Sequence, residues 1–238
     1  DDKVGELMAV LDATRQEAIV VFVSDHGDML GERGLWYKMN FFEGSARVPL
    51  MVAAPSMSAG LVTEAVSTLD VCPTLCDLAG VSMADVMPWT DGESLVGLSD
   101  GRHRESPVRM EYAAEASYAP LVGLRSGKYK HIRCALDPDM LFDLEADPHE
   151  RTNLAQDPAH AATAAALRAQ SEALWDLSRF DAAVRESQAR RWVVYEALRN
   201  GAYFPWDYQP LQKASERYMR NHMDLNVLEE SQRFPRGE

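Results

Sequence analysis

The stretch that decides the fold is Ala18-Ile-Val-Val-Phe-Val23, which runs directly into Ser24-Asp25-His26-Gly27-Asp28. An unbroken apolar run rich in β-branched residues predicts a strand that is covered on both faces. Apolar side chains at helical spacing in residues 3–11 predict a helix just before it. Helix, short loop, buried strand and polar loop form one unit of an α/β sheet. Ligands of such sheets gather at the carboxyl ends of the strands, where the Asp25 loop lies.

Further elements follow this unit along the chain. Residues 48–52 predict a second strand, and residues 68–79 predict an amphipathic helix that ends at Gly80. Residues 29–47 and residues 83–104 are rich in glycine and charge, which is typical of loops.

From about residue 105 the pattern changes to short pieces that predict a small antiparallel sheet. These pieces are residues 108–112, 121–125, 129–133 and 141–143, with a hairpin turn at Arg125-Ser-Gly-Lys-Tyr129. Residues 159–199 predict one or two helices ended by Asn200-Gly201. The last segment, residues 203–238, mixes aromatics, prolines and charges around a short helical piece at residues 211–219.

These elements predict an α/β protein in three parts. Residues 1–104 are expected to form an α/β part, whose opening helix without a starting methionine suggests a missing upstream segment. Residues 105–202 are expected to form a subdomain of antiparallel sheet plus helices, and residues 203–238 an extended tail.

Composition excludes some classes of partner. A net charge of −13 argues against nucleic acid, because phosphate binding needs clustered Lys and Arg. No apolar run approaches the ~20 residues that span a membrane. Cys72, Cys76 and Cys134 indicate no disulfide framework, and the first two are expected to be buried free thiols. We therefore expect a cytoplasmic protein, while an opening helix without a starting methionine suggests a missing upstream segment that leaves a signal peptide open.

The Asp25 loop carries the first chemical signal. An Asp and a His that project from a strand end supply oxygen and nitrogen donors suited to a divalent cation. Gly27 lets the backbone turn sharply at that point. The alternative is that Asp25 caps the next element and His26 lies on the surface.

A second signal lies in the aromatic and charged block of residues 36–49. Lys38 stands in a segment otherwise fit for burial, so it is expected either to face a fixed anion or to be a solvated surface lysine. Glu43 and Arg47 are expected to form an ion pair that fixes this loop.

Several blocks in a fixed order together resemble the sulfatases of the alkaline phosphatase superfamily. The blocks are Val21-Phe-Val-Ser-Asp-His-Gly-Asp28, Glu43-Gly-x-x-Arg47-Val-Pro49, Leu69-Asp-Val-Cys-Pro-Thr-Leu75, Asp91-Gly-Glu-Ser-Leu95 and Met140-Leu-Phe-Asp-Leu144-x-x-Asp147-Pro148-x-Glu150-x-x-Asn153-Leu154. They cover about residues 1–155. In the tail, Trp206-Asp-Tyr-Gln-Pro210, the run from Ser215 to Asp224 and Phe234-Pro-Arg236 resemble the choline sulfatases within that family.

This resemblance implies a fold and a set of site residues. The chain would be the carboxyl-terminal part of an alkaline-phosphatase-like sulfatase sheet with its subdomain and tail. Asp25 and His26 match the downstream pair of ligands of one divalent cation, most often Ca²⁺, with Mg²⁺ or Mn²⁺ as alternatives. Lys38 matches the catalytic lysine that contacts the sulfate. The family nucleophile, a formylglycine made in a Cys-x-Pro-x-Arg motif, is expected upstream, because none of the three cysteines begins such a motif.

The substrate implied by the tail is choline-O-sulfate, hydrolysed to choline and sulfate. A quaternary ammonium has no N–H to donate, so carboxylates and aromatic faces must recognise it. Glu115 is the candidate carboxylate by resemblance, and Asp224 is a weaker candidate that could reach an adjacent subunit. The alternatives to a substrate-binding role are that Glu115 is an exposed carboxylate at a strand end and that Asp224 is a structural residue of the tail. Expected partners are therefore the missing amino-terminal portion and further copies of the chain, joined through the tail.

Two other hypotheses stay open. The same metal and lysine positions would serve an arylsulfatase or a phosphonate or phosphodiester hydrolase of the superfamily. A non-catalytic assembly or binding fragment would also explain the absent nucleophile.

Overall fold

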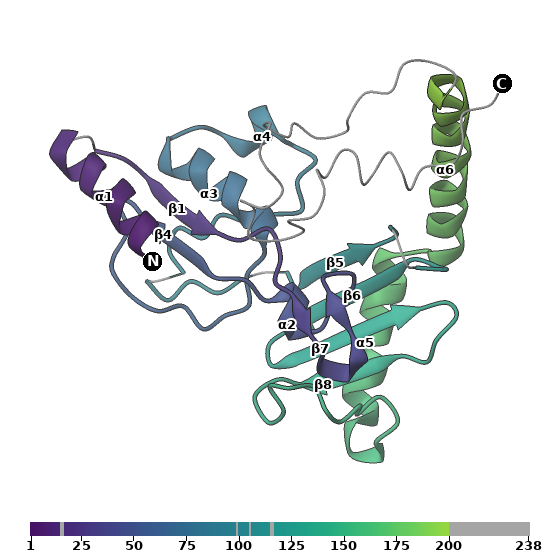
Figure 1. Ribbon diagram of the computed structural model, residues 1–238. Coiled ribbons are helices and arrows are strands. Elements are labelled where there is room, and N and C mark those ends of the chain that lie inside the picture. Colours follow the sequence, from purple (N-terminus) through teal and green to yellow (C-terminus); the bar gives the residue numbers. More distant parts are fainter. Residues whose placement is uncertain (15–16, 99, 105, 115–116, 200–238) are drawn as a thin grey trace. The chain divides into compact units, whose positions relative to one another are not determined.

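The computed structural model describes residues 1–14, 17–98, 100–104, 106–114 and 117–199 (Figure 1). The chain divides into two compact units, residues 1–181 and residues 182–238. The first unit carries the sheets and the site described below. Within the described residues, no helix is long and apolar enough to cross a membrane.

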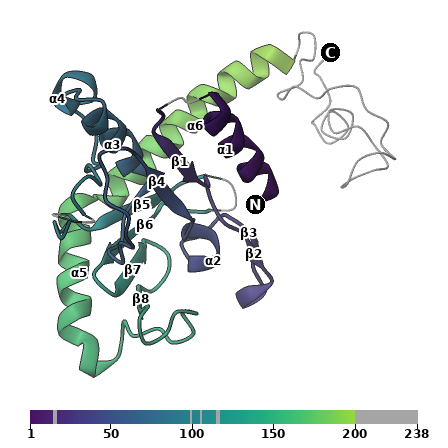
Figure 2. The same ribbon diagram turned by 90° about the vertical axis from the view of Figure 1, so that its left-hand side faces the viewer.

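The predicted helix and strand at the start of the chain are confirmed as α1 (Asp2–Thr14) and β1 (Val20–Val23). The second predicted strand is β4 (Leu50–Ala53), which lies antiparallel to β1 (Figure 2). Val21 pairs with Val52 in this ribbon. The prediction that β1 is covered on both faces is wrong for this chain, since Phe22 and Val23 are 39% and 40% exposed. A ribbon of two strands has too few neighbours to cover both of its faces.

Residues 29–47, predicted as a loop, contain short regular pieces. β2 (Met29–Leu30) and β3 (Trp36–Tyr37) form a small antiparallel hairpin around the 3-10 turn η1 (Glu32–Gly34). One helical turn, α2 (Glu43–Ala46), follows. The second predicted loop contains another helical turn, α4 (Met83–Val86).

The predicted antiparallel sheet is confirmed as four strands in the order β5-β6-β7-β8 (Figure 1). The strands are β5 (Val108–Tyr112), β6 (Leu121–Ser126), β7 (Tyr129–Cys134) and β8 (Met140–Asp143). Ser126 pairs with Tyr129 across a two-residue turn, in which Gly127 adopts a φ of 53° that glycine tolerates best.

Both faces of this sheet are covered, and each face takes alternate residues of β7. Ile132 packs with Phe41 and Phe142 on one face. On the other face lies α5 (Ala161–Leu174), which packs across β6 and β7; there Arg133 hydrogen-bonds Ser171 at 3.3 Å. The segment of residues 41–47 therefore packs against the four-stranded sheet through Phe41 and Phe42.

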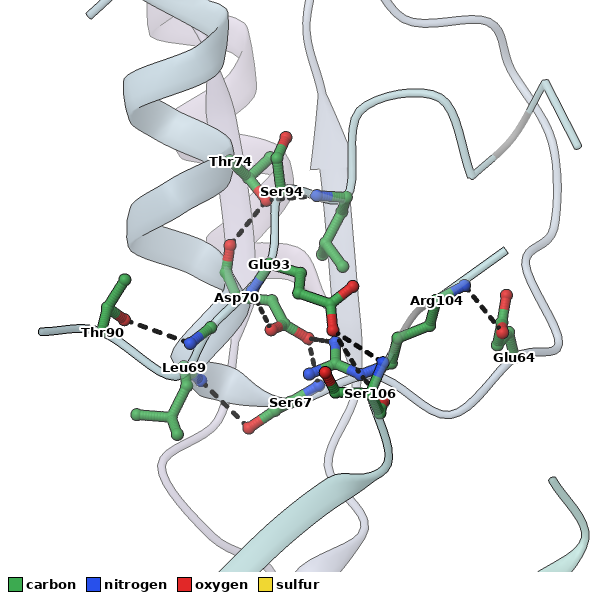
Figure 3. A network of polar contacts seen from close by, with 12 residues as sticks. Glu64, Ser67, Leu69, Asp70, Thr74, Thr90, Glu93, Ser94, Arg104 and Ser106 are labelled. Carbon is green, nitrogen blue, oxygen red and sulfur yellow. Dashed lines mark hydrogen bonds and ion pairs between the residues drawn. The ribbon is translucent and has the colours of Figure 1, made fainter. Parts of the chain in front are cut away.

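The predicted helix at residues 68–79 is the 3-10 turn η2 (Thr68–Asp70) followed by α3 (Val71–Leu78). Gly80, with a φ of 69°, follows the end of the helix as predicted. Asp70 is fully buried and accepts hydrogen bonds from the backbone N–H of Ser67 at 2.7 Å and of Glu93 at 2.8 Å (Figure 3). Its carboxylate also pairs with Arg104. This network fastens the loop between α4 and β5 onto the start of α3.

Residues 159–199 form two helices, α5 and α6 (Leu177–Arg199), after the 3-10 turn η3 (Pro158–His160). The predicted helix stop at Asn200-Gly201 and the helical piece at residues 211–219 lie outside the described residues. The domain boundaries expected near residues 104 and 202 stay a prediction.

Candidate active site

An open cleft of about 1110 Å³ lies in the first unit, and it gathers the predicted site residues of the strand-end loop. Its lining comes from the loop after β1, from residues 38–51, from residues 61–69 and from β5. Asp25, His26 and Lys38 all line this cleft. The loop that follows β1 therefore opens onto this cleft, and the roles expected for Asp25, His26 and Lys38 stay a prediction.

Lys38 and His26 are in direct contact. Lys38 Nζ lies 3.0 Å from Nε2 of His26, and Nδ1 of the same ring lies 2.8 Å from the carbonyl oxygen of Gly27. An ammonium group only donates and a carbonyl only accepts. The ring proton therefore belongs on Nδ1, and the lone pair of Nε2 accepts a hydrogen bond from the Lys38 ammonium group.

Asp25 lies beside this pair. Its Oδ1 accepts a 2.9 Å hydrogen bond from the backbone N–H of His26, and its Oδ2 lies 3.3 Å from His26 Nε2. The hydrogen bond from the His26 N–H lowers the pKa of the Asp25 carboxyl below its ordinary value, and the charge of Lys38 acts in the same direction. The Asp25 side chain is 82% exposed, so it is an available carboxylate.

These two side chains fit neighbouring ligands of one cation. Asp25 Oδ2 and His26 Nε2 lie 3.3 Å apart, close enough for both atoms to contact one ion. Among the described residues, no group of three His, Cys, Asp or Glu side chains gathers to hold a metal. The pair can therefore supply one side of a metal shell and needs further ligands.

The loop and Lys38 are both tied to α2. The backbone N–H of Gly27 donates a 2.8 Å hydrogen bond to the carbonyl oxygen of Ser45, and Ser45 Oγ donates to the carbonyl oxygen of Lys38. A Cβ on Gly27 would run into the carbonyl group of Gly44. Only glycine at position 27 lets the Asp25-His26 loop approach α2 this closely.

The predicted ion pair between Glu43 and Arg47 is wrong. Glu43 Oε1 instead lies 2.5 Å from Nζ of Lys130, a β7 residue whose side chain is only 1% exposed. A lysine withdrawn from water needs carboxylate partners, whereas the Arg47 side chain lines the open cleft. Lys130 was not among the predicted site residues, although it shares one face of a predicted strand with the apolar Ile132, which indicates an inward position.

Neither predicted substrate carboxylate can be placed. Glu115 and Asp224 lie outside the described residues. Strand β5, which precedes Glu115, does line the cleft through Met110, Glu111 and Tyr112. Glu111 accepts a 2.6 Å hydrogen bond from the indole N–H of Trp175.

Comparisons with known proteins identify the family of the chain. Residues 31–176 match the family described as N-sulphoglucosamine sulphohydrolase, C-terminal. A solved phosphonate monoester hydrolase of Agrobacterium radiobacter is 26% identical, with a TM-score of 0.61 over 73% of this chain and 38% of its own. Arylsulfatase K of Mus musculus is 34% identical over 65% of this chain and 30% of its own length. The chain therefore belongs to the sulfatases of the alkaline phosphatase superfamily, of which it forms a carboxyl-terminal region with their α/β fold.

The similarity becomes more specific towards the tail. Residues 182–234 match the family described as Choline sulfatase enzyme C terminal. The chain as a whole is 66% identical to the choline-sulfatase of Rhizobium meliloti, over 100% of this chain and 48% of that protein. It thus spans about half the length of this relative and carries the carboxyl-terminal part of a sulfatase like it.

Proposed function

We propose that this chain is the carboxyl-terminal part of an enzyme that hydrolyses choline-O-sulfate to choline and sulfate. The observation that carries the proposal is the grouping of Asp25, His26 and Lys38 within hydrogen-bond distance at the rim of one cleft. The 66% identity to a choline-sulfatase, which extends through the tail, supports this choice of substrate.

The chain's own part in the reaction is to hold a cation and an anion side by side. Asp25 Oδ2 and His26 Nε2 would ligate a divalent ion, with two further carboxylates expected from upstream residues. Sulfatases generally use a divalent metal and a formylglycine. We propose Ca²⁺ for the ion here, with Mg²⁺ or Mn²⁺ as alternatives, since carboxylate oxygens suit all three. When bound, such an ion polarises a sulfuryl oxygen and orients the nucleophile.

Lys38 supplies the second positive charge. Its ammonium group contacts His26 in the chain, and a sulfate ester bound at the cleft rim would offer it stronger acceptors. Negative charge grows on the sulfuryl and leaving oxygens as the ester bond breaks. A donor that already points at this position stabilises the transition state without reorganisation. We therefore assign Lys38 as catalytic and sulfate-binding.

Recognition of the choline moiety would fall to carboxylates and aromatic faces near β5. Glu115 follows this strand, whose Tyr112 lines the cleft, and Asp224 in the tail is a second candidate. We further propose assembly with the amino-terminal half of the enzyme, homo-oligomerisation through the tail, and a cytoplasmic location. The free thiols of Cys72, Cys76 and Cys134 fit that last proposal.

A second candidate function rests on a separate observation. The fold neighbour with a TM-score of 0.61 is a phosphonate monoester hydrolase, so the same positions could serve phosphonate or phosphodiester substrates. A third candidate, a non-catalytic assembly fragment, fits a chain in which no cysteine begins a Cys-x-Pro-x-Arg motif.

One experiment separates these three functions. The chain replaces the carboxyl-terminal half of the Rhizobium meliloti choline-sulfatase, and the chimera is assayed with choline-O-sulfate, a neutral aryl sulfate and a phosphonate monoester. Choline release that EDTA abolishes and Ca²⁺ restores supports our proposal, with no release expected from the 238-residue chain alone. Preference for the phosphonate would favour the second function. Complete inactivity of a folded chimera with intact formylglycine would favour the third.

A further inference from the structure

Lys130 is a charged residue buried in the middle of the subdomain sheet. Its side chain is 1% exposed, and its Nζ donates a 2.8 Å hydrogen bond to the carbonyl oxygen of Phe41. The same nitrogen lies 2.5 Å from Glu43 Oε1. Phe41 lies just before α2, and Glu43 is the first residue of α2. Burying an ammonium group is unfavourable unless its partners are fixed, so this contact defines where that segment lies.

Glu150 holds the same segment from a second direction. Its Oε2 accepts a 2.7 Å hydrogen bond from the backbone N–H of Glu43. Its Oε1 lies 2.8 Å from Lys130 Nζ as a charge neighbour, without the geometry of a hydrogen bond. The side chain is 3% exposed and the backbone φ is 55°, a conformation that few residues other than glycine adopt. The turn at Glu150 is thus held in an unfavourable backbone state that directs a carboxylate onto α2.

Ser45 connects α2, which Lys130 and Glu150 hold in place, to the residues of the candidate site. It lies in α2, two residues beyond Glu43, and is 3% exposed. Its hydroxyl donates to the carbonyl oxygen of Lys38, and its own carbonyl accepts the N–H of Gly27. A continuous series of contacts therefore runs from Lys130 and Glu150 through Ser45 to both halves of the site.

The hairpin before Lys38 is held against the same surface. The guanidinium of Arg33 stacks 4.3 Å from the ring centre of Phe42 and 5.5 Å from that of Phe142 in β8. Tyr37, the residue before Lys38, has a φ of 66°. Strain of this kind persists only where surrounding contacts over-determine the backbone.

We propose that Lys130 and Glu150 are positioning residues of the active site. They fix α2 against the subdomain sheet, and Ser45 in α2 then sets the distance between Lys38 and the Asp25-His26 loop. This inference rests on the proposed function for its catalytic consequence, but the mechanical link itself can be tested without any activity.

The mechanical link is measured by hydrogen exchange on the 238-residue chain. Lys130→Met should speed exchange of the Gly27 and Glu43 amides on the order of tenfold, because both amides donate within this network. Lys128→Met is the matched control: it removes a 2.6 Å ion pair with Asp143 at the end of the same sheet. Unchanged exchange at Gly27 in a folded Lys130→Met chain overturns the proposal.

The catalytic consequence is measured in the chimera by a double-mutant cycle. Lys130→Met and Ser45→Ala should each lower kcat on the order of 10- to 100-fold, with KM within about threefold, since a misplaced group far from the chemistry acts on the transition state. In a Lys38→Met background Ser45→Ala should cost little more, because its hydroxyl acts on the carbonyl of Lys38, whereas Lys130→Met should keep the part of its effect that passes through the Asp25-His26 loop. A Ser45→Ala loss that multiplies in full with the Lys38→Met loss would overturn the positioning role.

Two variants keep the test decisive if Lys130→Met fails to fold. Ser45→Ala leaves both ion pairs intact, and it should lower kcat while the Glu43 amide stays protected. Glu150→Gln keeps an acceptor for the Glu43 N–H and should lose less activity than Glu150→Ala. Equal losses for these two Glu150 variants would overturn the assignment of Glu150. If the unmutated chimera hydrolyses no sulfate ester, the proposed function is refuted but the positioning role is not. The hydrogen exchange of the Gly27 amide then tests whether Lys130 fixes the Asp25-His26 loop.

Discussion

Lys38 Nζ lies 3.0 Å from Nε2 of His26, so the candidate sulfate-binding group and a candidate metal ligand form one contact. Replacing Lys38 by Met should lower kcat of the chimera on the order of 100- to 1000-fold, as removal of a preorganised donor to a developing oxyanion does. Steady-state kinetics with choline-O-sulfate measures this. Lys3→Met, which removes an exposed lysine paired with Glu6 in α1, should leave kcat unchanged. A Lys38→Met enzyme with normal kcat would remove Lys38 from the catalytic machinery.

Glu115 is proposed to face the choline cation, so its charge should matter only for a cationic substrate. Glu115→Gln should weaken the binding of choline-O-sulfate by about 1.5–3 kcal/mol, the range for a lost contact to a charged group. Inhibition constants for choline-O-sulfate and a neutral aryl sulfate provide the comparison, with Glu186→Gln in α6 as the control. Equal weakening for both esters would exclude Glu115 from the choline site.

Gly27 lies against the backbone of α2, where a Cβ has no room. Gly27→Ala should destabilise the chain by about 1–3 kcal/mol, as overpacking does, and should also reduce its affinity for divalent ions. Urea unfolding and calcium titration of the chimera check the two effects. Gly60→Ala meets nothing within 4 Å and should be neutral or stabilise by up to about 1 kcal/mol. Equal stability of the two variants would contradict the close approach of the loop to α2.

Arg104 and Asp70 form an ion pair in which the side chains are 7% and 0% exposed. Arg104→Met leaves the Asp70 carboxylate buried without its cation, which should lower the free energy of unfolding by about 3–5 kcal/mol. Denaturant unfolding measures this. Arg109→Met breaks a pair whose side chains are 31% and 62% exposed, and should cost less than about 1 kcal/mol. Similar losses for the two arginines would show that burial does not control the pair.

His131 gives the stability of the chain a pH dependence. Burial lowers the pKa of His131 below its ordinary value of 6.5, and Arg133 and Arg168 act in the same direction against the opposing effect of Asp139. The unfolded chain therefore binds more protons than the native chain just below pH 6.5. The free energy of unfolding should fall as the pH decreases from about 6.5 through the native pKa, and then level off.

Urea unfolding at pH 7.5, 6.5 and 5.5 measures this dependence. His131→Gln should flatten the curve over this window, whereas His103→Gln, which alters a side chain that is 90% exposed, should leave it unchanged. A His131→Gln chain with the original pH dependence would assign the effect to other groups.

The sequence predicts the parts of the fold that local patterns encode. Strands β5–β8 and the turn at Gly127 follow from short alternating runs and one glycine, so their bounds agree with the structure within one residue. The burial of β1 was mispredicted because it depends on strands next to it in space. The hairpin β2–β3 was missed because strands of two residues have no periodicity to detect.

In the candidate site, too, the sequence indicated some residues, but it did not indicate the long-range contacts between them. Asp25, His26 and Lys38 were identified from a strand-end loop and a likeness to sulfatases, and the structure brings them together. The partners of Glu43 could not be read from the sequence, because Lys130 and Glu150 lie far along the chain. The nearby Arg47 was the plausible partner on sequence distance alone.

Glu150 has a practical consequence for engineering. A design method that scores each residue by its backbone angles would replace Glu150 with glycine, since a φ of 55° penalises any side chain. That exchange would relieve local strain while removing the carboxylate that receives the Glu43 amide and neighbours Lys130. The loss of a buried charge partner outweighs the strain that is relieved, so backbone angles taken alone would select a less stable chain at this position.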